Sequence, residues 1–291
     1  MADLTYARQD ETPLYPKILL NRPVSRSGAG RLLLVGGHSG DFSLPTNIYQ
    51  VAMASGLGEC TVVLPDSLLK LLGGMSATVF APSSPSGSLG TAARGQILEL
   101  AEESDVVAIG GNLSNNSETS ILIEHLLGDI QRPVMVYDDA LSIIDHNTSL
   151  ITNRTTTVVV TTMPEMFKLA KTLRVPITIR RDGGIINKLE IVRDIAVASS
   201  CDYVVYGSET IVSAGGKLGF TPANYRLSLV PALIYGVIAT FFTQNPKVRF
   251  EGLMTAAYVI NQIGKSLDAV KRPSITNLTE ALREELTKDG W

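Results

Sequence analysis

Short apolar runs alternate with amphipathic segments along most of the chain. The apolar runs are rich in Val, Ile and Leu, and they end in glycine, hydroxyl or carboxylate residues. Continuous runs of this kind are typical of strands buried on both faces of a mostly parallel sheet. The pattern predicts strands within 31–37, 59–65, 105–113, 132–141 and the first half of 155–173, and a strand with a hairpin within 201–220.

Helical periodicity fills the segments between these strands. It predicts helices within 44–58, 91–104, 116–127 and the second half of 155–173, and C-terminal helices at 227–243, 250–268 and 276–288. Strands that alternate with helices in this order predict a three-layer α/β/α fold with a mostly parallel central sheet.

Length and hydrophobic content favour one large core. The chain has 291 residues, of which 45% are hydrophobic. A chain of this size can bury one sizeable core, so we expect a single domain at 31–291. Residues 1–30 are rich in proline and polar groups and are expected to form an N-terminal arm. The arm contains "ILL" at 18–20, which is too apolar for a free tail.

Charge and residue usage exclude several classes of function. The net charge is −3 and the sequence pI is about 5.7, so we expect neither nucleic acid nor anionic lipid as a partner. The three histidines form no cluster with the two cysteines, which argues against a metal site. Cys60 and Cys201 adjoin apolar runs, and this favours two buried thiols in a reducing cytosol over a disulfide.

The most apolar stretch of the chain is "LSLVPALIYGVIATFF" at 227–242. Its apolar block, 229–242, has 14 residues, whereas roughly 20 are needed to span a bilayer. A turn signal, "TQNPK", follows it, and the N-terminal residues contain no apolar signal segment. We therefore expect a cytoplasmic protein without a membrane partner, in which 227–243 is a core helix.

Small and polar residues gather where the predicted strands end. In mostly parallel sheets the ligand crevice lies beyond the carboxyl ends of the strands. Glycines also end strands for conformational reasons alone, but the repetition of glycine, hydroxyl and carboxylate favours a ligand site. The residues at these ends include Gly37, His38, Gly110, Asn112, Asp138, Asp139, Thr162, Gly207 and Ser208.

Several motifs, taken in order, resemble the ADP/ATP-dependent NAD(P)H-hydrate dehydratases. The matching stretches are "RSGAGRLLLVGGHSGDFSLPTNIYQVAMASGLG", "AIGGNL", "PVMVYDDAL", "TTMPEM" and "VVYGSETIV". The resemblance covers nearly the whole chain from about residue 16. It implies a ribokinase-like fold, ADP or ATP with Mg as cofactor and NADPH hydrate as substrate. It also implies nucleotide or substrate contacts at Gly37, Gly110, Asp139, Glu165, Gly207 and Ser208.

The chain departs from the family where phosphate would be handled. In the family a Gly-Thr-Gly-Asp turn opens the long helix after the hairpin, and its backbone N–H groups bind an anion at the positive end of the helix dipole. Here the corresponding residues are 229–232, "LVPA". The acid has become Ala232, and Pro231 has no N–H to donate. Pro231 suits the first turn of a helix, with Ser228 as a candidate cap.

Other family positions have also changed. The family Lys is Tyr206, the first acid of its "DAD" pattern is Tyr137, its His is Thr162, and its Gly-Ala pair after the first strand is Ser43 and Leu44. The two tyrosines would either fill the former nucleotide pocket, which is the simpler interpretation, or stack on a base.

Individual candidates keep two interpretations each. Asp139 would hold a ribose or substrate hydroxyl, or it would cap a helix at 140–145. Glu165 matches a family glutamate near the phosphate region, or it is a solvated residue in the first turn of a helix. His38 and Asp41, with Asp138, are weak catalytic candidates, because a loop histidine beside glycine is usually only exposed.

Two hypotheses about function remain open. One is a degenerate homologue that binds a nucleotide-like ligand with little or no dehydratase activity, and the other is an active dehydratase, a carbon–oxygen lyase, that uses other residues. Arg226 and Lys217 would lie near the former phosphate loop and could bind an anion, although charged loop residues are solvated by default. The resemblance also implies a homo-oligomer, a dimer or tetramer in which the N-terminal arm contacts neighbouring chains.

Overall fold

The computed structural model describes residues 4–73, 77–152, 154, 156–178, 184–223, 231–268, 270 and 272–287. Its centre is one ten-stranded sheet with the strand order β1-β10-β9-β8-β7-β6-β5-β2-β3-β4. The strands are β1 (Ala7–Arg8), β2 (Arg31–Val35), β3 (Glu59–Pro65), β4 (Thr78–Ala81), β5 (Val106–Ile109), β6 (Val134–Tyr137), β7 (Thr157–Thr162), β8 (Asp202–Tyr206), β9 (Glu209–Ala214) and β10 (Lys217–Pro222).

Most neighbouring strands are parallel. The exception is β9, which pairs antiparallel with both β8 and β10 and so forms the hairpin that the sequence predicts. The carboxyl ends of β2, β5, β6, β7 and β8 therefore lie along one side of the sheet, which we call the carboxyl edge. The opposite side, where these strands begin, is the amino edge.

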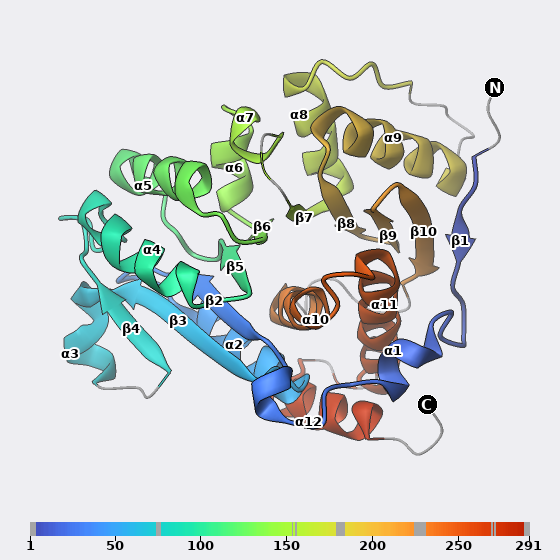
Figure 1. Cartoon of the computed structure of the whole chain (residues 1–291), viewed down its shortest axis with the longest axis horizontal. Coiled ribbons are helices and arrows are strands. Elements are labelled where there is room, and N and C mark those ends of the chain that lie inside the picture. The colour runs from blue at the N-terminus through green and yellow to red at the C-terminus, as the bar shows by residue number, and fades with distance from the viewer. Residues whose placement is uncertain are drawn as a thin grey trace.

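Helices cover both faces of the sheet (Figure 1). One face packs against α1 (Pro16–Leu20), α2 (Ser43–Ala54), α10 (Pro231–Gln244), α11 (Arg249–Ser266) and α12 (Ile275–Leu286). The other packs against α4 (Arg94–Glu102), α5 (Ser117–Asp129), α6 (Ala140–Ile144), α7 (Ser149–Thr152), α8 (Met163–Thr172) and α9 (Gly184–Ser199). The chain thus has the predicted three-layer α/β/α architecture. The short α3 (Leu69–Leu72) follows β3, and 3₁₀ turns lie at Arg26–Gly28, Asp66–Leu68 and Thr91–Ala93.

The helix α10 lies in the interior of the domain. Every residue from 232 to 243 is buried, because α10 packs against the sheet, α2 and α11. Figure 1 shows it between the strands and α11. Its composition is therefore explained by burial, as predicted for a core helix. None of the helices among the described residues is long and apolar enough to cross a membrane.

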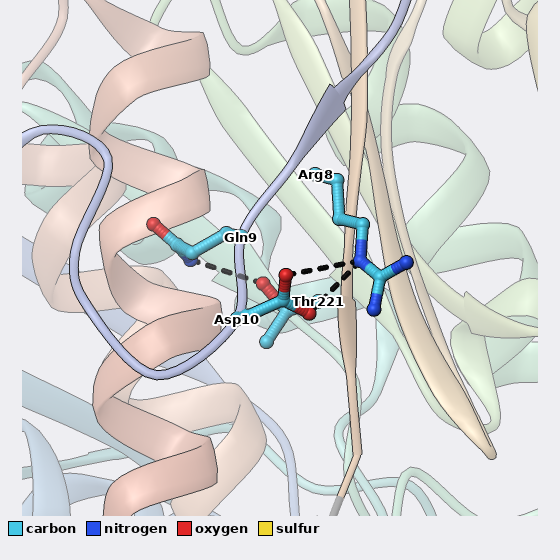
Figure 2. A network of polar contacts seen from close by, with 4 residues as sticks. All are labelled: Arg8, Gln9, Asp10 and Thr221. Atoms are coloured by element: carbon cyan, nitrogen blue, oxygen red, sulfur yellow. Dashed lines mark hydrogen bonds and ion pairs between the residues drawn. The ribbon is translucent and has the colours of Figure 1, made fainter.

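The N-terminal arm packs onto the sheet. Its strand β1 pairs with β10, and the next residue, Gln9, is fully buried. The Gln9 amide donates to Thr221 Oγ1 at 3.0 Å and to the Met254 carbonyl at 2.7 Å, while Arg8 pairs with Asp10 on the outer side (Figure 2). Further along the arm, Arg22 donates to the carbonyls of Ser55 and Leu286, at the ends of α2 and α12.

Sequence reasoning missed some elements and placed others well. The strand at 59–65 and the three C-terminal helices match closely, but β1, β4 and α9 were not predicted. The predicted helix at 116–127 is capped by the side chain of Asn116. Residues 227–230, with the proposed Ser228 cap, lie outside the described residues, while Pro231 does begin α10. Both cysteines are free and buried.

Candidate functional site

Two glycine pairs bring the ends of β2 and β5 into direct backbone contact. The Gly37 N–H donates to the Gly111 carbonyl at 2.9 Å. A Cβ on Gly36 would lie 2.4 Å from the Gly110 carbonyl oxygen, and Gly37 and Gly110 have φ values of +79° and +144°. Only glycine tolerates this approach and these φ values. Gly37 and Gly110 therefore have a structural reason to be glycine, and their predicted ligand contacts stay predictions.

The carboxylate of Asp139 holds the loop between β5 and α5. It accepts the backbone N–H of Gly111 at 3.0 Å and that of Leu113 at 2.5 Å. Burial, then repulsion from Asp138, raises its pKa to about 6, although the two N–H groups act in the opposite direction. Asp139 does sit at the cap position of α6, but its side chain makes no cap hydrogen bond there. The side chain instead holds the loop between β5 and α5 in place.

Asp41 and Asn112 join the loops after β2 and β5. Asp41 accepts hydrogen bonds from the backbone N–H and the hydroxyl of Ser43, at 2.9 and 2.8 Å, and from the Asn112 amide at 3.0 Å. The Asn112 amide oxygen accepts the Leu44 N–H at 3.1 Å. The Ser43 hydrogen bonds lower the pKa of Asp41. This carboxylate is therefore held ionised at the start of α2.

His38 lies next to Asp41 in the sequence but forms no side-chain pair with it among the described residues. Their contact is between backbones, with the His38 N–H donating to the Asp41 carbonyl at 2.9 Å. The His38 ring accepts the Gly40 N–H on Nδ1 at 3.0 Å. A ring nitrogen that accepts locally is fixed in the loop, so the geometry adds nothing to a catalytic role for His38.

The Glu165 side chain caps the N-terminus of α8. One oxygen, Oε2, accepts from the Thr162 N–H and from the hydroxyls of Thr161 and Thr162, at 3.0 to 3.2 Å. This is a capping arrangement, and it gives Glu165 a local structural role at the carboxyl edge. Glu165 also contributes to raising the pKa of Asp138, whose main cause is burial.

Ser208 and Gly207 lie in the turn between β8 and β9. The Ser208 hydroxyl donates to Glu209 at 2.7 Å, and Lys188 of α9 donates to both Ser208 and Glu209, at 3.1 and 2.5 Å. Lys188 was not predicted as a site residue, because it lies on α9, a helix that the sequence pattern did not predict. The only signal was a lysine on an apolar helical pattern.

A tyrosine cluster fills the space beneath the carboxyl edge. The Tyr137 ring is fully buried, with its centroid 4.6 Å from that of Tyr235 on α10. The Tyr206 and Tyr235 hydroxyls are 2.8 Å apart. Of the two interpretations for Tyr137, filling is the one this geometry matches, since a buried ring has no face open to a base. Tyr235 was missed, because its position opposite β6 depends on how α10 packs.

A hollow of about 300 Å³ opens at the start of α10. It lies between the beginnings of α2, α10 and α12 and the loop after β5, and we call it the α10 hollow. The described residues that line it are Ser43, Leu44, Asn47, Asn112, Pro231, Ala232, Pro273, Ile275 and Leu278. It thus collects the positions that differ from the family pattern near the phosphate loop, Ser43 and Leu44 on one side and Pro231 and Ala232 on the other.

The position of Lys217 contradicts the expectation that it lies near the former phosphate loop. It begins β10 at the amino edge, opposite the start of α10, and pairs with Glu251 at 2.5 Å. It therefore cannot bind an anion at the former phosphate loop. Arg226, the other cation expected there, lies outside the described residues.

Comparison with curated proteins relates the chain to one group. It is 33% identical over 147 residues to the bifunctional NAD(P)H-hydrate repair enzyme Nnr of Moorella thermoacetica, and this match covers 49% of the chain and 28% of that protein. The protein of the same name from Methanothermobacter thermautotrophicus is 27% identical over 135 residues, with 45% and 26% covered. The matches thus span only about a quarter of the length of these relatives. No protein-family model matches the chain.

Solved structures agree with this group. A ribokinase-like superfamily protein of Enterococcus faecalis has a TM-score of 0.70 at 16% identity, with 98% of each chain covered. The ADP/ATP-dependent NAD(P)H-hydrate dehydratase of Bacillus subtilis, co-crystallised with ATP and Mg²⁺, has a TM-score of 0.61 at 14% identity, with 94% of this chain and 97% of that one covered. The fold is ribokinase-like. The chain is a divergent relative of the NAD(P)H-hydrate repair enzymes.

For this relative of the repair enzymes, the described residues that begin α10 carry neither a cation nor an acid for the phosphates of ADP or ATP. At the start of α10, Pro231 has no N–H to donate, and Ala232 is buried and carries no acid. The Tyr206 hydroxyl is hydrogen-bonded to the Tyr235 hydroxyl. Nor do the described residues contain a group of three or more His, Cys, Asp or Glu that could hold a metal ion.

Proposed function

We propose that this chain is a ribokinase-like homologue of the NAD(P)H-hydrate repair enzymes that binds a small ligand at the carboxyl edge and has little or no dehydratase activity. The observation that carries the proposal is the start of α10. There Pro231 removes a backbone donor, and Ala232 stands where the resemblance places the catalytic acid.

The physical reason lies in how phosphoryl chemistry is catalysed. The transferring group must be stabilised by N–H donors, cations and a base in position. The described carboxyl edge carries Asp41, Asp138, Asp139 and Glu165, and the lysine beside Ser208, Lys188, is bound to Glu209. Negative groups without matching cations disfavour the approach of a phosphate.

An activity assay tests this proposal. Purified protein is incubated with NADPH hydrate and either ADP or ATP with Mg²⁺, and the return of NADPH absorbance is followed. We expect no rate above the uncatalysed reaction, with the Bacillus subtilis dehydratase as the positive control. Nucleotide-dependent conversion by this chain would overturn the proposal.

A second candidate function is favoured by the raised pKa of Asp139. A carboxyl with a pKa of about 6 is suited to proton transfer near neutral pH. If the assay shows turnover, Asp139→Asn is expected to remove it, whereas Asp10→Asn, on the exposed outer side of the arm, should leave it unchanged. Equal turnover in both variants would exclude Asp139 as the acid or base.

Assembly and location are part of the same proposal. We propose a cytoplasmic dimer or tetramer made of a 31–291 domain and a 1–30 arm. The exposed side chains of Leu14, Leu20 and Val24 on the arm support contact with a neighbouring chain. Light scattering at micromolar concentration is expected to exceed the 31.2 kDa of one chain, and a particle of that mass would contradict the proposal.

A further inference from the structure

A further hollow, of about 400 Å³, opens at the amino edge of the sheet, on the opposite side from the α10 hollow. We call it the β5–β6 hollow, because the residues that precede these two strands line it together with the last turn of α10. Its floor is apolar and consists of Val106, Pro133, Phe242 and Pro246. Pockets for small molecules commonly combine apolar walls with a few polar groups that orient the ligand. The polar groups of this hollow are therefore the ones to consider.

Two opposite charges adjoin in the wall of the β5–β6 hollow without forming an ion pair in the described part of the chain. Asp105 precedes β5 and Arg132 precedes β6, and the register of these strands makes the two residues neighbours. A backbone group holds each side chain. Asp105 Oδ2 accepts the Arg31 N–H at 2.8 Å, and Arg132 Nη2 donates to the Glu102 carbonyl. Asp105 Oδ1 and two nitrogens of Arg132 have no hydrogen-bond partner among the described residues, so both charges can receive a ligand.

The other charges around the β5–β6 hollow are of both signs. Arg249, which also lines it, already pairs with Asp202 at 2.6 Å. Residues that adjoin the lining ones, in the sequence or through a hydrogen bond, add the cations Arg26, Arg31, Arg154 and Lys247 and the acids Glu59, Glu102 and Glu103. A surrounding of mixed sign disfavours a ligand that carries only negative or only positive charge.

We infer that the β5–β6 hollow binds a free α-amino acid with a ring side chain, its ammonium group at Asp105 and its carboxylate at Arg132. The helix α10 packs over β2 and β5, so the negative end of its dipole lies on the Asp105 side and favours the ammonium group. Neighbouring strands are about 4.8 Å apart, a spacing that suits two charged groups attached to one carbon atom.

The apolar floor accounts for the ring. Phe242 and Pro133 present flat apolar surface beneath the two charges, and an aromatic side chain gains most from contact with such surface. The volume of about 400 Å³ lies within the range of pockets for small ligands. The inference goes beyond the proposed function, because this hollow lies at the other edge of the sheet from the ligand site proposed there.

Calorimetric titration of the full chain with L-phenylalanine tests the inference. The comparison ligands are 3-phenylpropanoate, which lacks the ammonium group, and 2-phenylethylamine, which lacks the carboxylate. We expect L-phenylalanine to bind about tenfold more tightly than either, because each comparison ligand leaves one charged side chain of the hollow without a partner.

Two variants separate the two charges. Asp105→Asn keeps an oxygen for the Arg31 N–H, and it should weaken L-phenylalanine about tenfold while leaving 3-phenylpropanoate unchanged. Arg132→Gln should weaken L-phenylalanine and 3-phenylpropanoate about tenfold and leave 2-phenylethylamine unchanged. The matched controls are Asp10→Asn and Arg8→Gln, which make the same chemical changes on the exposed outer side of the arm and should alter none of these affinities.

Three results contradict the inference. They are no binding of L-phenylalanine at millimolar concentration, equal binding of the three ligands, and an affinity that Asp105→Asn and Asp10→Asn change alike. If Arg132→Gln does not fold, Arg132→Lys keeps the charge without the planar fork and should still weaken 3-phenylpropanoate. The comparison of the three ligands on the unmodified chain needs no variant. The dehydration assay decides the proposed function separately.

Discussion

The two edges of the sheet differ in how most of their described carboxylates are bound, although Lys188 and Glu209 also form an ion pair at the carboxyl edge. At the amino edge, carboxylates meet cations. Asp202 accepts Arg249 at 2.6 Å and Lys217 pairs with Glu251 at 2.5 Å. At the carboxyl edge, Asp139, Asp41 and Glu165 accept mainly from backbone N–H groups and hydroxyls. Two larger hollows, of about 420 and 400 Å³, lie at the amino edge among the described residues.

This difference shows that hollow size and charge alone do not locate a ligand site. The amino-edge hollows are lined by charged residues that include paired ones, such as Asp202 and Arg249. The smaller α10 hollow lies beyond the carboxyl ends of parallel strands, where topology places ligands in folds of this class. Next to it, Asp41 and Asp139 fix the loops after β2 and β5 through hydrogen bonds, and residues of these loops form part of the wall of the hollow.

The largest expected effect comes from breaking an amino-edge pair. Asp202→Ala should lower the free energy of unfolding by about 3 kcal/mol, because it leaves the partly buried Arg249 without its carboxylate. The matched control is Asp194→Ala, whose pair with Arg193 is exposed, and it should cost less than about 1 kcal/mol. Urea unfolding measures both. Equal costs would show that burial does not distinguish the two pairs.

Removing the Asp139 carboxylate at the carboxyl edge should lower the free energy of unfolding by less than Asp202→Ala does. Asp139→Ala leaves the Gly111 and Leu113 N–H groups without their acceptor, and we expect a loss of about 2 kcal/mol in the free energy of unfolding. Asp139→Asn keeps one acceptor oxygen and should lose about half as much. Hydrogen exchange should speed up at residues 110–116 in Asp139→Ala. Unchanged exchange there would contradict the role given to this carboxylate.

The two aspartates of the carboxyl edge should respond to pH with opposite signs. The folded state raises the pKa of Asp139 to about 6 from its ordinary 3.8, so the folded protein holds that proton more tightly. The stability of the wild type relative to Asp139→Asn should fall as pH rises from about 4 to about 6. For Asp41, whose pKa is lowered, the stability relative to Asp41→Asn should instead fall as pH drops below about 4. Thermal unfolding of the wild type and the two variants across this pH range would measure how each stability difference changes with pH. Changes of the same sign for both aspartates would refute the opposite pKa shifts given to them.

The smallest effect is expected from restoring part of the phosphate loop. Pro231→Gly with Ala232→Asp returns one donor and one carboxylate but leaves Tyr206 in place. Inorganic phosphate binding, measured by its effect on the melting temperature, should improve slightly, and no dehydration should appear. Turnover in this double variant would mean that the start of α10 alone separates an inactive chain from an active one.

Much of the fold could be predicted from the sequence. The buried strands β2, β3, β5, β6, β7 and β8 are continuous apolar runs, and their alternation with helices fixes the layers. The helix α9 was missed because its apolar positions at 185–197 follow a polar stretch without a clear start signal. The strands β1 and β4 are short edge strands, and short edges carry little periodicity for a pattern to detect.

The candidate site could be predicted only in outline. The residues at the ends of the predicted strands indicated that a site would lie at the carboxyl edge, near Asp139, Asp41 and Glu165. What each carboxylate bonds to could not be foreseen, because it depends on loops from different strands meeting in space. Asp139 reaches the loop after β5, 26 to 28 residues away in the chain. Tyr235 and Asn47 lie on helices, and only packing shows which side they face.

The buried Gln9 has a consequence for the time course of folding. Its partner Thr221 lies 212 residues further along the chain, and β1 has no place in the sheet until β10 exists. At ordinary synthesis rates the ribosome needs roughly 10 to 40 s to add that many residues. During this interval the arm, with its apolar "ILL", has to wait without its docking surface. The segment made early is thus among the last to be packed, and the interval is when this chain most needs protection from association.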